Sequence, residues 1–354
     1  MNPITRLSRL SALLLSAAAA CLAAETAPVD QARREGLPRK VVIGTVVIGP
    51  EFFARPLSER IAQLEPTVSD MEAKARAEYA GRGLDLAVLP EAFLENPGDT
   101  VAAQAVEIGA VEPAASACAV RHHSYLIAPA ILREHNPDRY SNTALLFDRK
   151  GALVGIYRKV HPVAPQGSDV IETGTTPGSA FPVFDCDFGR LGIQICFDML
   201  YPDGWEALAR QGAEIVALPS ASPQTSYPLI YAMQHRYYVV SAVPRDHAAV
   251  YSPAGVIEKE ATRPSTVVDQ IDLSYAVIHW EATLLEGEAF RKAFGDRAGF
   301  HYYHDQDTGI FWSNDPAVPI ARMLRQLDLP EVQASVERIR VLQDRARGGP
   351  PASP

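Results

Sequence analysis

Three residues that could do chemistry stand at the ends of strand-like runs. Glu91 follows "LDLAVLP", Lys159 closes "LVGIYRK", and Cys196 closes "RLGIQIC". Because sites in α/β proteins assemble at the carboxyl ends of strands, we expect the carboxylate, the ammonium and the thiol to meet there. Taken singly, the glutamate fits a solvated turn, the lysine a surface position and the cysteine a core position. It is their combination that indicates a site.

A thiol, a carboxylate and an ammonium together suit attack on a carbonyl or nitrile carbon. A free thiol is mostly protonated at neutral pH, and we predict that Lys159 and the N-terminus of a following helix lower the pKa of Cys196. Glu91 would take the thiol proton and return it to a leaving amine. Lys159 would stabilise the oxyanion, and backbone N–H groups after the cysteine would add a second donor. The three residue types therefore predict a thiol hydrolase.

The elements that must position these residues alternate between short β-branched runs and longer helical stretches. Buried strands are expected at 40–49, 84–90, 124–132 and 214–221, and helices at 57–80, which Pro66 interrupts or splits, and 99–120. A hairpin is expected at 141–159, where "DRKG" separates two strand-like runs. This alternation indicates an α/β protein with mixed sheets whose faces are covered by helices.

Composition favours a globular protein that acts on a small molecule. The chain has 354 residues, is 47% hydrophobic, carries a net charge of -9 and has no long basic block, so we expect no nucleic-acid partner. No glycine-rich phosphate-binding motif follows a strand, so no nucleotide cofactor is expected. The sequence has no HExxH or CxxC motif, and its histidines, including His122 and His123, lack ligand spacing. No metal is therefore expected.

The first 24 residues are typical of a bacterial export signal. Arg6 and Arg9 precede an apolar segment that is too short to span a bilayer, and small residues follow it. No later run is long enough to cross a membrane, so the mature protein is expected in the periplasm or outside the cell. It would be either soluble or lipid-anchored through Cys21. If the signal is removed at or after Cys21, at most Cys118, Cys186 and Cys196 remain to pair, which leaves at least one free thiol.

The motifs around the three chemical residues resemble those of the nitrilase superfamily, carbon-nitrogen hydrolases that use a Glu-Lys-Cys triad. "AVLPEAF" is similar to the glutamate motif, "YRKVHP" to the lysine motif and "GIQICFDMLYPD" to the cysteine motif. The order and the separations of the three residues also match. "YYVVSAV" and "YSPAGVI" resemble later strands of the family, so the resemblance covers about residues 40–273.

This resemblance implies a catalytic triad of Glu91, Lys159 and Cys196. It also implies a second glutamate beside the lysine, for which Glu172 is the candidate, although Asp169 lies close to it in sequence. Asp198, with the turn at Pro202, is expected to fix the direction in which the thiol leaves the sheet.

The resemblance also implies a four-layer αββα sandwich that usually pairs into an eight-layer dimer, so a homodimer or a higher homo-oligomer is expected. Residues 274–354 are interpreted as a C-terminal extension that packs on the domain or on a partner subunit. We interpret the aromatic residues of this extension as packing rather than as a ligand site.

The expected reaction is cleavage of a non-peptide C–N bond in a small linear amide or carbamoyl compound, through a Cys196 thioester and with release of ammonia or an amine. Nitrile hydrolysis and acyl transfer to an amine or lipid are alternatives on the same fold. A non-enzymatic scaffold disagrees with three filled triad positions, and a papain-like protease would need a different local sequence and a downstream histidine. Four positions depart from the family pattern and limit any transfer of substrate: Asp203, Gln234, His235 and Val243.

Overall fold

The computed structural model describes residues 33–348, which form two compact units. One unit is Lys40–Ile271, and the other combines the described parts of the flanking segments, 33–39 and 272–348. The export signal and Cys21 lie outside the described residues. Within the described part of the chain, no helix is both long enough and apolar enough to cross a membrane.

The first sheet of the larger unit has six strands in the order β12-β1-β2-β3-β4-β5. Strands β1, β2 and β3 run parallel, and β3, β4 and β5 run antiparallel, so the sheet is mixed as expected. The predicted hairpin around "DRKG" joins β4 to β5. The strands are β1 (Lys40–Val47), β2 (Leu86–Val88), β3 (Tyr125–His135), β4 (Asp138–Phe147), β5 (Leu153–Arg158) and β12 (Ser265–Asp272).

The second sheet also has six strands, in the order β11-β10-β9-β8-β7-β6. Its centre, β7, β8 and β9, is parallel, while both edges are antiparallel. The strands are β6 (Val183–Cys186), β7 (Gly189–Ile193), β8 (Ile215–Pro219), β9 (Tyr238–Ala242), β10 (Ala248–Tyr251) and β11 (Ile257–Ala261).

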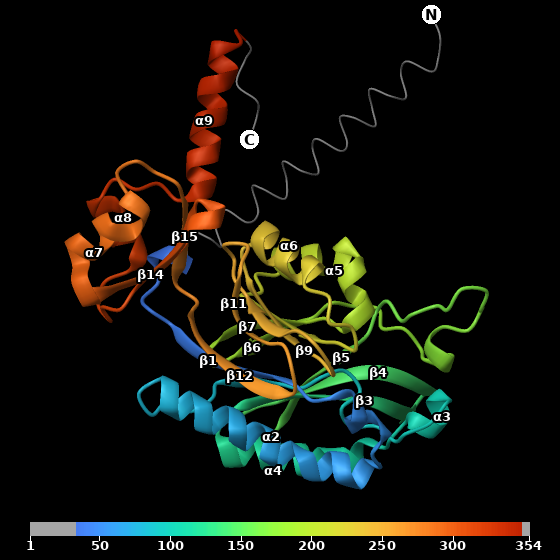
Figure 1. Ribbon diagram of the computed structural model, residues 1–354. Helices are drawn as coiled ribbons and strands as arrows, with labels where there is room; N and C mark the ends of the chain where they lie inside the picture. The colour runs from blue at the N-terminus through green and yellow to red at the C-terminus, as the bar shows by residue number, and fades with distance from the viewer. Residues whose placement is uncertain (1–32, 349–354) are drawn as a thin grey trace, which may run out of the picture. The chain divides into compact units, whose positions relative to one another are not determined.

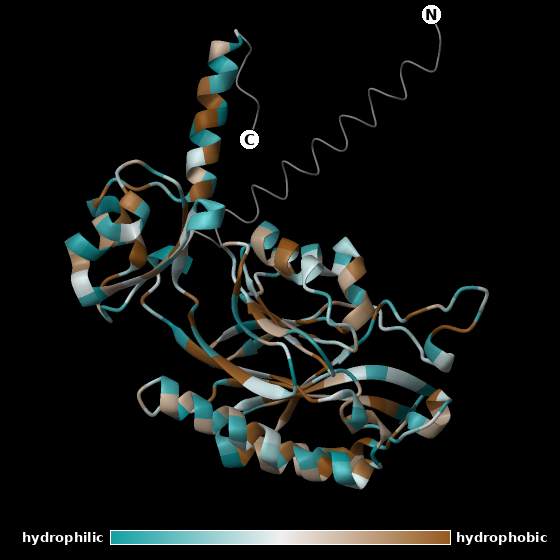
Figure 2. Cartoon of the chain, in the orientation of Figure 1, coloured by the Kyte–Doolittle hydropathy of each residue, from teal (hydrophilic) through white to brown (hydrophobic). Residues whose placement is uncertain are grey.

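The two sheets face each other, and each is covered by helices on its outer side (Figure 1). Helices α2 (Leu57–Glu78) and α4 (Ile108–His122) cover the first sheet, and α5 (Pro202–Arg210) and α6 (Ser226–His235) cover the second. Because both faces of each sheet are buried, the central strands are continuously apolar (Figure 2). These layers form the predicted αββα sandwich.

Helix boundaries differ from the sequence expectation at two places. Helix α2 runs through Pro66 without splitting, although the proline removes one backbone hydrogen bond. Residues on the inner face of the helix, including Leu64 and Val68, are buried in the core, and this burial offsets the lost bond. The stretch expected as one helix at 99–120 is two, α3 (Val101–Gln104) and α4. Between them Val106 donates its N–H to the carbonyl of Ile131 in β3, which requires extended backbone.

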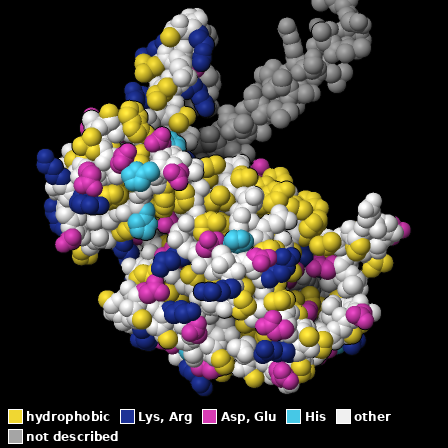
Figure 3. Space-filling view, in the orientation of Figure 1, with side chains coloured by type: hydrophobic (Ala, Val, Ile, Leu, Met, Phe, Trp, Pro, Cys, Tyr) yellow, Lys and Arg dark blue, Asp and Glu magenta, His cyan; other side chains and the backbone are white. Residues whose placement is uncertain are grey.

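The smaller unit contains a three-stranded antiparallel sheet in the order β13-β15-β14. Phe290, Phe294 and Phe311 are buried in its core, in line with a packing role. The outer helix α9 exposes Val336, Ile339 and Leu342, and Figure 3 shows hydrophobic and basic side chains together on its visible face. The elements are β13 (Tyr275–His279), α7 (Glu288–Phe294), β14 (Ala298–Tyr303), β15 (Thr308–Ser313), α8 (Ile320–Gln326) and α9 (Val332–Ala346).

Candidate active site

The three predicted residues meet between the two sheets, each just beyond the end of a strand. Glu91 follows β2 and Lys159 follows β5 in the first sheet, while Cys196 follows β7 in the second. The Lys159 Nζ atom lies 2.8 Å from Glu91 Oε1, and both side chains are buried. The Cys196 thiol lies close enough to the Glu91 carboxylate for each group to shift the pKa of the other. The structure thus brings together a carboxylate, an ammonium and a thiol that are distant in sequence.

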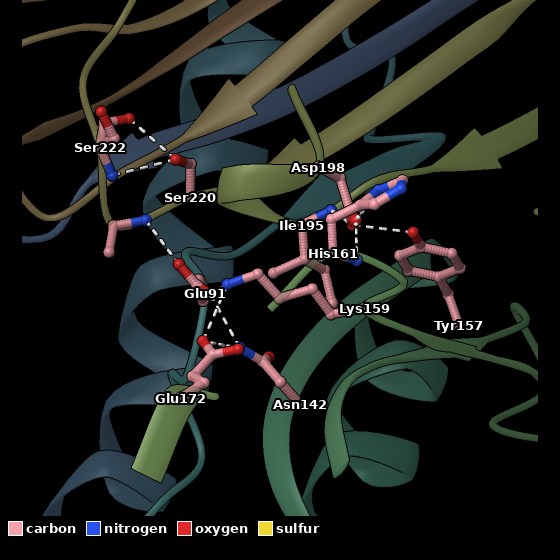
Figure 4. A network of polar contacts seen from close by, with 11 residues as sticks. Glu91, Asn142, Tyr157, Lys159, His161, Glu172, Ile195, Asp198, Ser220 and Ser222 are labelled. Atoms are coloured by element: carbon pink, nitrogen blue, oxygen red, sulfur yellow. Dashed lines mark hydrogen bonds and ion pairs between the residues drawn. The ribbon is translucent and has the colours of Figure 1, made fainter. Parts of the chain in front are cut away.

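Glu172 adds a second carboxylate to the lysine. Its Oε1 atom lies 2.8 Å from Lys159 Nζ, on a short turn that spans Glu172–Gly174 (Figure 4). Asp169, the other acidic residue of this loop, is exposed. The structure therefore places Glu172 at the position expected for the second glutamate.

Asn142 completes this cluster and was not identified from the sequence. Its Nδ2 group donates to Glu91 Oε1 at 2.8 Å and to Glu172 Oε1 at 2.9 Å (Figure 4). The predicted hairpin could have indicated Asn142. In the register of the β4–β5 hairpin, Asn142 lies beside Lys159, whose N–H donates to the Asn142 carbonyl. The other oxygens, Asn142 Oδ1 and Glu172 Oε2, are buried acceptors without a hydrogen-bond donor.

The charges of Glu91, Glu172 and Lys159 depend on the burial of each side chain and on the positive charge of Lys159. Burial alone would raise the pKa of Glu91, but the Lys159 ammonium and hydrogen bonds from Lys159, Asn142 and Cys196 lower it overall. For Glu172, burial prevails over the same ammonium and raises its pKa. Desolvation would lower the pKa of Lys159, but the two carboxylates outweigh it and raise the pKa. Glu91 is therefore an ionised base beside a charged lysine.

The thiol differs from the sequence expectation. Burial raises the pKa of Cys196 to about 12 and the Glu91 charge adds to this, while Lys159 and hydrogen bonds to Ser220 and Ala221 offset only part of the rise. The expectation of a lowered pKa is wrong for two reasons. The lysine charge is already balanced by carboxylates, and the cysteine begins a five-residue 3-10 turn rather than an α-helix. The resting nucleophile is a neutral thiol.

Asp198 holds this turn against the first sheet. Its Oδ2 atom accepts from Ile195 N at 2.9 Å and from the Tyr157 hydroxyl at 2.7 Å, and its Oδ1 atom accepts from His161 N at 2.8 Å (Figure 4). The carboxylate is fully buried. Cys196 itself has a φ of 44°, a left-handed conformation that needs such support in a residue with a side chain. These contacts agree with the expected positioning role of Asp198.

A buried arginine supports the turn that carries Glu91. Arg60 of α2 donates to the carbonyl of Ala92 at 3.0 Å and pairs with Glu95 at 3.4 Å. Burial raises the pKa of Glu95 to about 7 although Arg60 opposes this shift. Sequence reasoning missed this pair because charged residues in amphipathic helices ordinarily face solvent. The pair fixes the backbone next to the base.

The positions that depart from the family pattern lie outside the charge cluster. Asp203 is exposed and approaches His161 only at 3.4 Å. Gln234 is exposed, while His235 stacks on Tyr231 and contacts Tyr237 in a tilted arrangement, and burial lowers the pKa of this histidine to about 4. Val243 packs between the sheets.

A comparison with known families matches most of the larger unit. The profile described as Carbon-nitrogen hydrolase matches residues 54–277, which include Glu91, Lys159 and Cys196. The chain belongs to the carbon-nitrogen hydrolase family. It is an amidase-type hydrolase by this membership, and the match includes every strand of the two large sheets except β1, which lies before residue 54.

Two curated relatives are similar to this chain over most of their own length. The chain is 29% identical over 220 residues to Omega-amidase NIT2 of Homo sapiens, covering 55% of this chain and 79% of the relative. It is 27% identical over 228 residues to Omega-amidase NIT2-B of Xenopus laevis, covering 56% and 80%.

Two solved structures share the fold. Saccharomyces cerevisiae Nit3, of the nitrilase superfamily, superposes with a TM-score of 0.55 at 21% identity and covers 73% of this chain and 96% of its own. An amidase from Nesterenkonia sp. gives a TM-score of 0.53 at 21% identity, covering 65% and 90%.

Proposed function

We propose that this carbon-nitrogen hydrolase uses Cys196 to cleave the C–N bond of a small linear amide or carbamoyl compound, releasing ammonia or an amine. The observation that carries the proposal is the position of Lys159, 2.8 Å from both Glu91 and Glu172, beside the cysteine thiol. This arrangement supplies a base, a cation and a nucleophile in one buried place.

In the acylation step, Glu91 takes the thiol proton as the sulfur attacks the carbonyl carbon. Since the thiol is neutral at rest, proton removal and attack are coupled rather than sequential. The Lys159 ammonium stabilises the oxyanion of the tetrahedral intermediate. The protonated Glu91 then donates its proton to the nitrogen, the C–N bond breaks, and a thioester remains on Cys196.

In the deacylation step, water takes the place of the amine. Glu91 removes a proton from the water, the hydroxide oxygen attacks the thioester carbon, and Lys159 again stabilises the oxyanion. Collapse of the intermediate breaks the C–S bond, the sulfur regains the proton from Glu91, and the acid leaves. The Ala221 N–H holds Glu91 Oε2 at 2.9 Å, which keeps the carboxylate oriented through both steps.

The relatives favour an amide over a nitrile, because two of those similar to this chain are omega-amidases. Acyl transfer is the second candidate, since the same thioester would react with an amine in place of water. Added amine would then yield acyl-amine product in preference to free acid.

The test is ammonia release from a panel of small amides, carbamoyl amines and nitriles. Cys196→Ser should reduce turnover about 10³-fold or more while leaving the circular dichroism spectrum unchanged. Cys186→Ser is the matched control, because Cys186 is a free, half-buried cysteine on β6 and should leave activity intact. Undiminished turnover in Cys196→Ser, or no mass adduct on Cys196 during turnover, would refute the proposal.

We further propose that the chain is exported, either soluble or lipid-anchored through Cys21. The support is the sequence of the first 24 residues, with Arg6 and Arg9 ahead of an apolar segment. The mature N-terminus, read by mass spectrometry, should then lie at or after Cys21, and a chain that retains Met1 in the envelope fraction would contradict export.

A further inference from the structure

A second cluster of reactive side chains lies in the outer helical layer, away from the catalytic residues. It consists of Glu65 on α2 and of Cys118 and His122 on α4. Their potential ligand atoms, a carboxylate oxygen, a sulfur and an imidazole nitrogen, all lie within 4.8 Å of one another. Cys118 and His122 are four residues apart, so they share one face of α4 and point at α2 together. Sequence spacing alone did not reveal the group, because Glu65 belongs to another helix.

The surroundings of His122 indicate that a cation belongs in this cluster. The ring is buried between two carboxylates, with Nδ1 2.5 Å from Glu72 Oε2 and Nε2 3.2 Å from Glu65 Oε1. If the Nδ1 proton is donated to Glu72, the Nε2 lone pair faces an oxygen lone pair of Glu65. Such an arrangement is repulsive unless either a second proton or a metal ion lies between the two atoms.

We propose that Glu65, Cys118 and His122 form a binding site for a divalent cation of the zinc class. Oxygen, nitrogen and sulfur donors together match the ligand preference of zinc, and water would complete a tetrahedral shell. Glu72 would act from outside the shell, because its bond to Nδ1 fixes the tautomer that leaves Nε2 free to bind metal. On binding, the thiol proton of Cys118 and any proton on Nε2 leave to solvent, and a metal–sulfur and a metal–nitrogen bond form.

The cation has a route into the site. Glu65 has a side-chain exposure of 35%, so the ion can arrive from the solvent side of the helical layer. Arg121 also contacts Glu65 Oε1 at 3.2 Å, and its positive charge would oppose a metal ion at that place. Its side chain is 67% exposed, so it can turn into solvent when the metal binds. Cation binding would then tie α2 to α4.

The experiment is a cobalt(II) titration of the chelator-treated full-length protein, because cobalt(II) reports thiolate ligation by a charge-transfer band. We expect one equivalent of cobalt to produce this band, zinc to displace it, and zinc to raise the melting temperature. Cys118→Ser should abolish the band, and Glu65→Gln and His122→Gln should each weaken cobalt binding about tenfold or more. Amide turnover should be unchanged in Cys118→Ser, since the cluster does not contact the catalytic residues.

His123→Asn is the matched control. His123 is exposed, adjoins the site in sequence and has the left-handed backbone that asparagine tolerates, so its replacement should leave the cobalt band intact. The proposal is overturned if the wild type binds no cobalt. It is also overturned if the band survives in Cys118→Ser. If Cys118→Ser fails to fold, Glu65→Gln still tests the proposal, because Glu65 is partly exposed and its replacement should be tolerated.

Discussion

The nucleophile of this site is a neutral thiol beside an ionised base. A pKa raised above the ordinary value of a cysteine favours the protonated form, and the pKa of Cys196 rises to about 12 through burial and the nearby Glu91. Lys159 cannot reverse this, because its charge is shared between two carboxylates. The site therefore depends on Glu91 to remove the proton during attack, rather than on a thiolate formed beforehand.

This protonation state can be measured by the ultraviolet absorbance of thiolates. The difference in absorbance between the wild type and Cys196→Ser should show no thiolate between about pH 6 and pH 9, since the thiol stays protonated below its raised pKa. The same comparison with Cys186→Ser controls for a cysteine outside the site. A titration of Cys196 with a midpoint below about pH 8 would mean that Lys159 dominates the electrostatics instead.

Single residues were predictable where they follow a strand that is itself visible in the sequence. Glu91, Lys159 and Cys196 were found in this way, and the structure gathers them. Asn142 and Arg60 were not found, because their positions depend on the register of a hairpin and on the depth of a helix in the core. The pKa of the thiol was also not predictable, since it depends on burial and on the full set of charges.

At the scale of elements, Asp198 links the two segments that carry Cys196 and Lys159. It accepts from Ile195 before the cysteine turn, from Tyr157 in β5, and from His161 beyond Lys159. One carboxylate therefore sets the end of β7 relative to the end of β5. The distance between the thiol and the lysine depends on this link.

Asp198→Asn should both destabilise the domain and slow turnover. The amide would turn an NH₂ donor toward groups that are themselves donors, which leaves buried N–H groups unpaired and should cost about 3 kcal/mol of unfolding free energy. Turnover should fall about 10²-fold or more, because the thiol moves relative to Glu91. Urea unfolding and ammonia release measure the two effects.

Asp203→Asn is the matched control, because Asp203 is exposed and contacts His161 only weakly, at 3.4 Å. This change should shift the unfolding free energy by about 0.5 kcal/mol or less. If Asp198→Asn behaves in the same way, the link between the strands is not what holds the site together.

Elements were predictable where one backbone pattern prevails over a long run. The apolar strands and the "DRKG" hairpin correspond to β1, β3, β8 and the β4–β5 pair, because buried β-branched runs and turn residues act locally. The break between α3 and α4 was missed, since Val106 is drawn into a bridge with β3 that no local pattern encodes. Tertiary contacts also explain why α2 continues through Pro66, because burial of its inner face offsets the hydrogen bond that the proline removes.

At the scale of the whole molecule, the two helical layers of the sandwich differ in outer surface. The α5–α6 layer exposes Ile230 at 48% and Met233 at 45%, which lie three residues apart on one face of α6. The α2–α4 layer exposes one large hydrophobic residue, Val120. Clustered apolar exposure is typical of an interaction surface, whereas a single exposed residue is common on any protein. The four layers were predictable from the family resemblance, but this difference between them was not, because it depends on which helix faces turn outward.

We therefore expect a homodimer in which two α5–α6 layers stack, as the eight-layer arrangement implies. Adding charge to this layer with Ile230→Glu and Met233→Glu together should convert the dimer to a monomer in light scattering, because each buried carboxylate would lack a partner. Val120→Glu, a matched change on the opposite layer, should leave the dimer intact. A wild-type monomer, or equal dissociation by Val120→Glu, would contradict this arrangement. The monomeric variant should still release ammonia at the wild-type rate, which would show that each subunit holds a complete site. This is expected because the catalytic residues all come from one chain, at β2, β4, β5, β7 and the turn at Glu172.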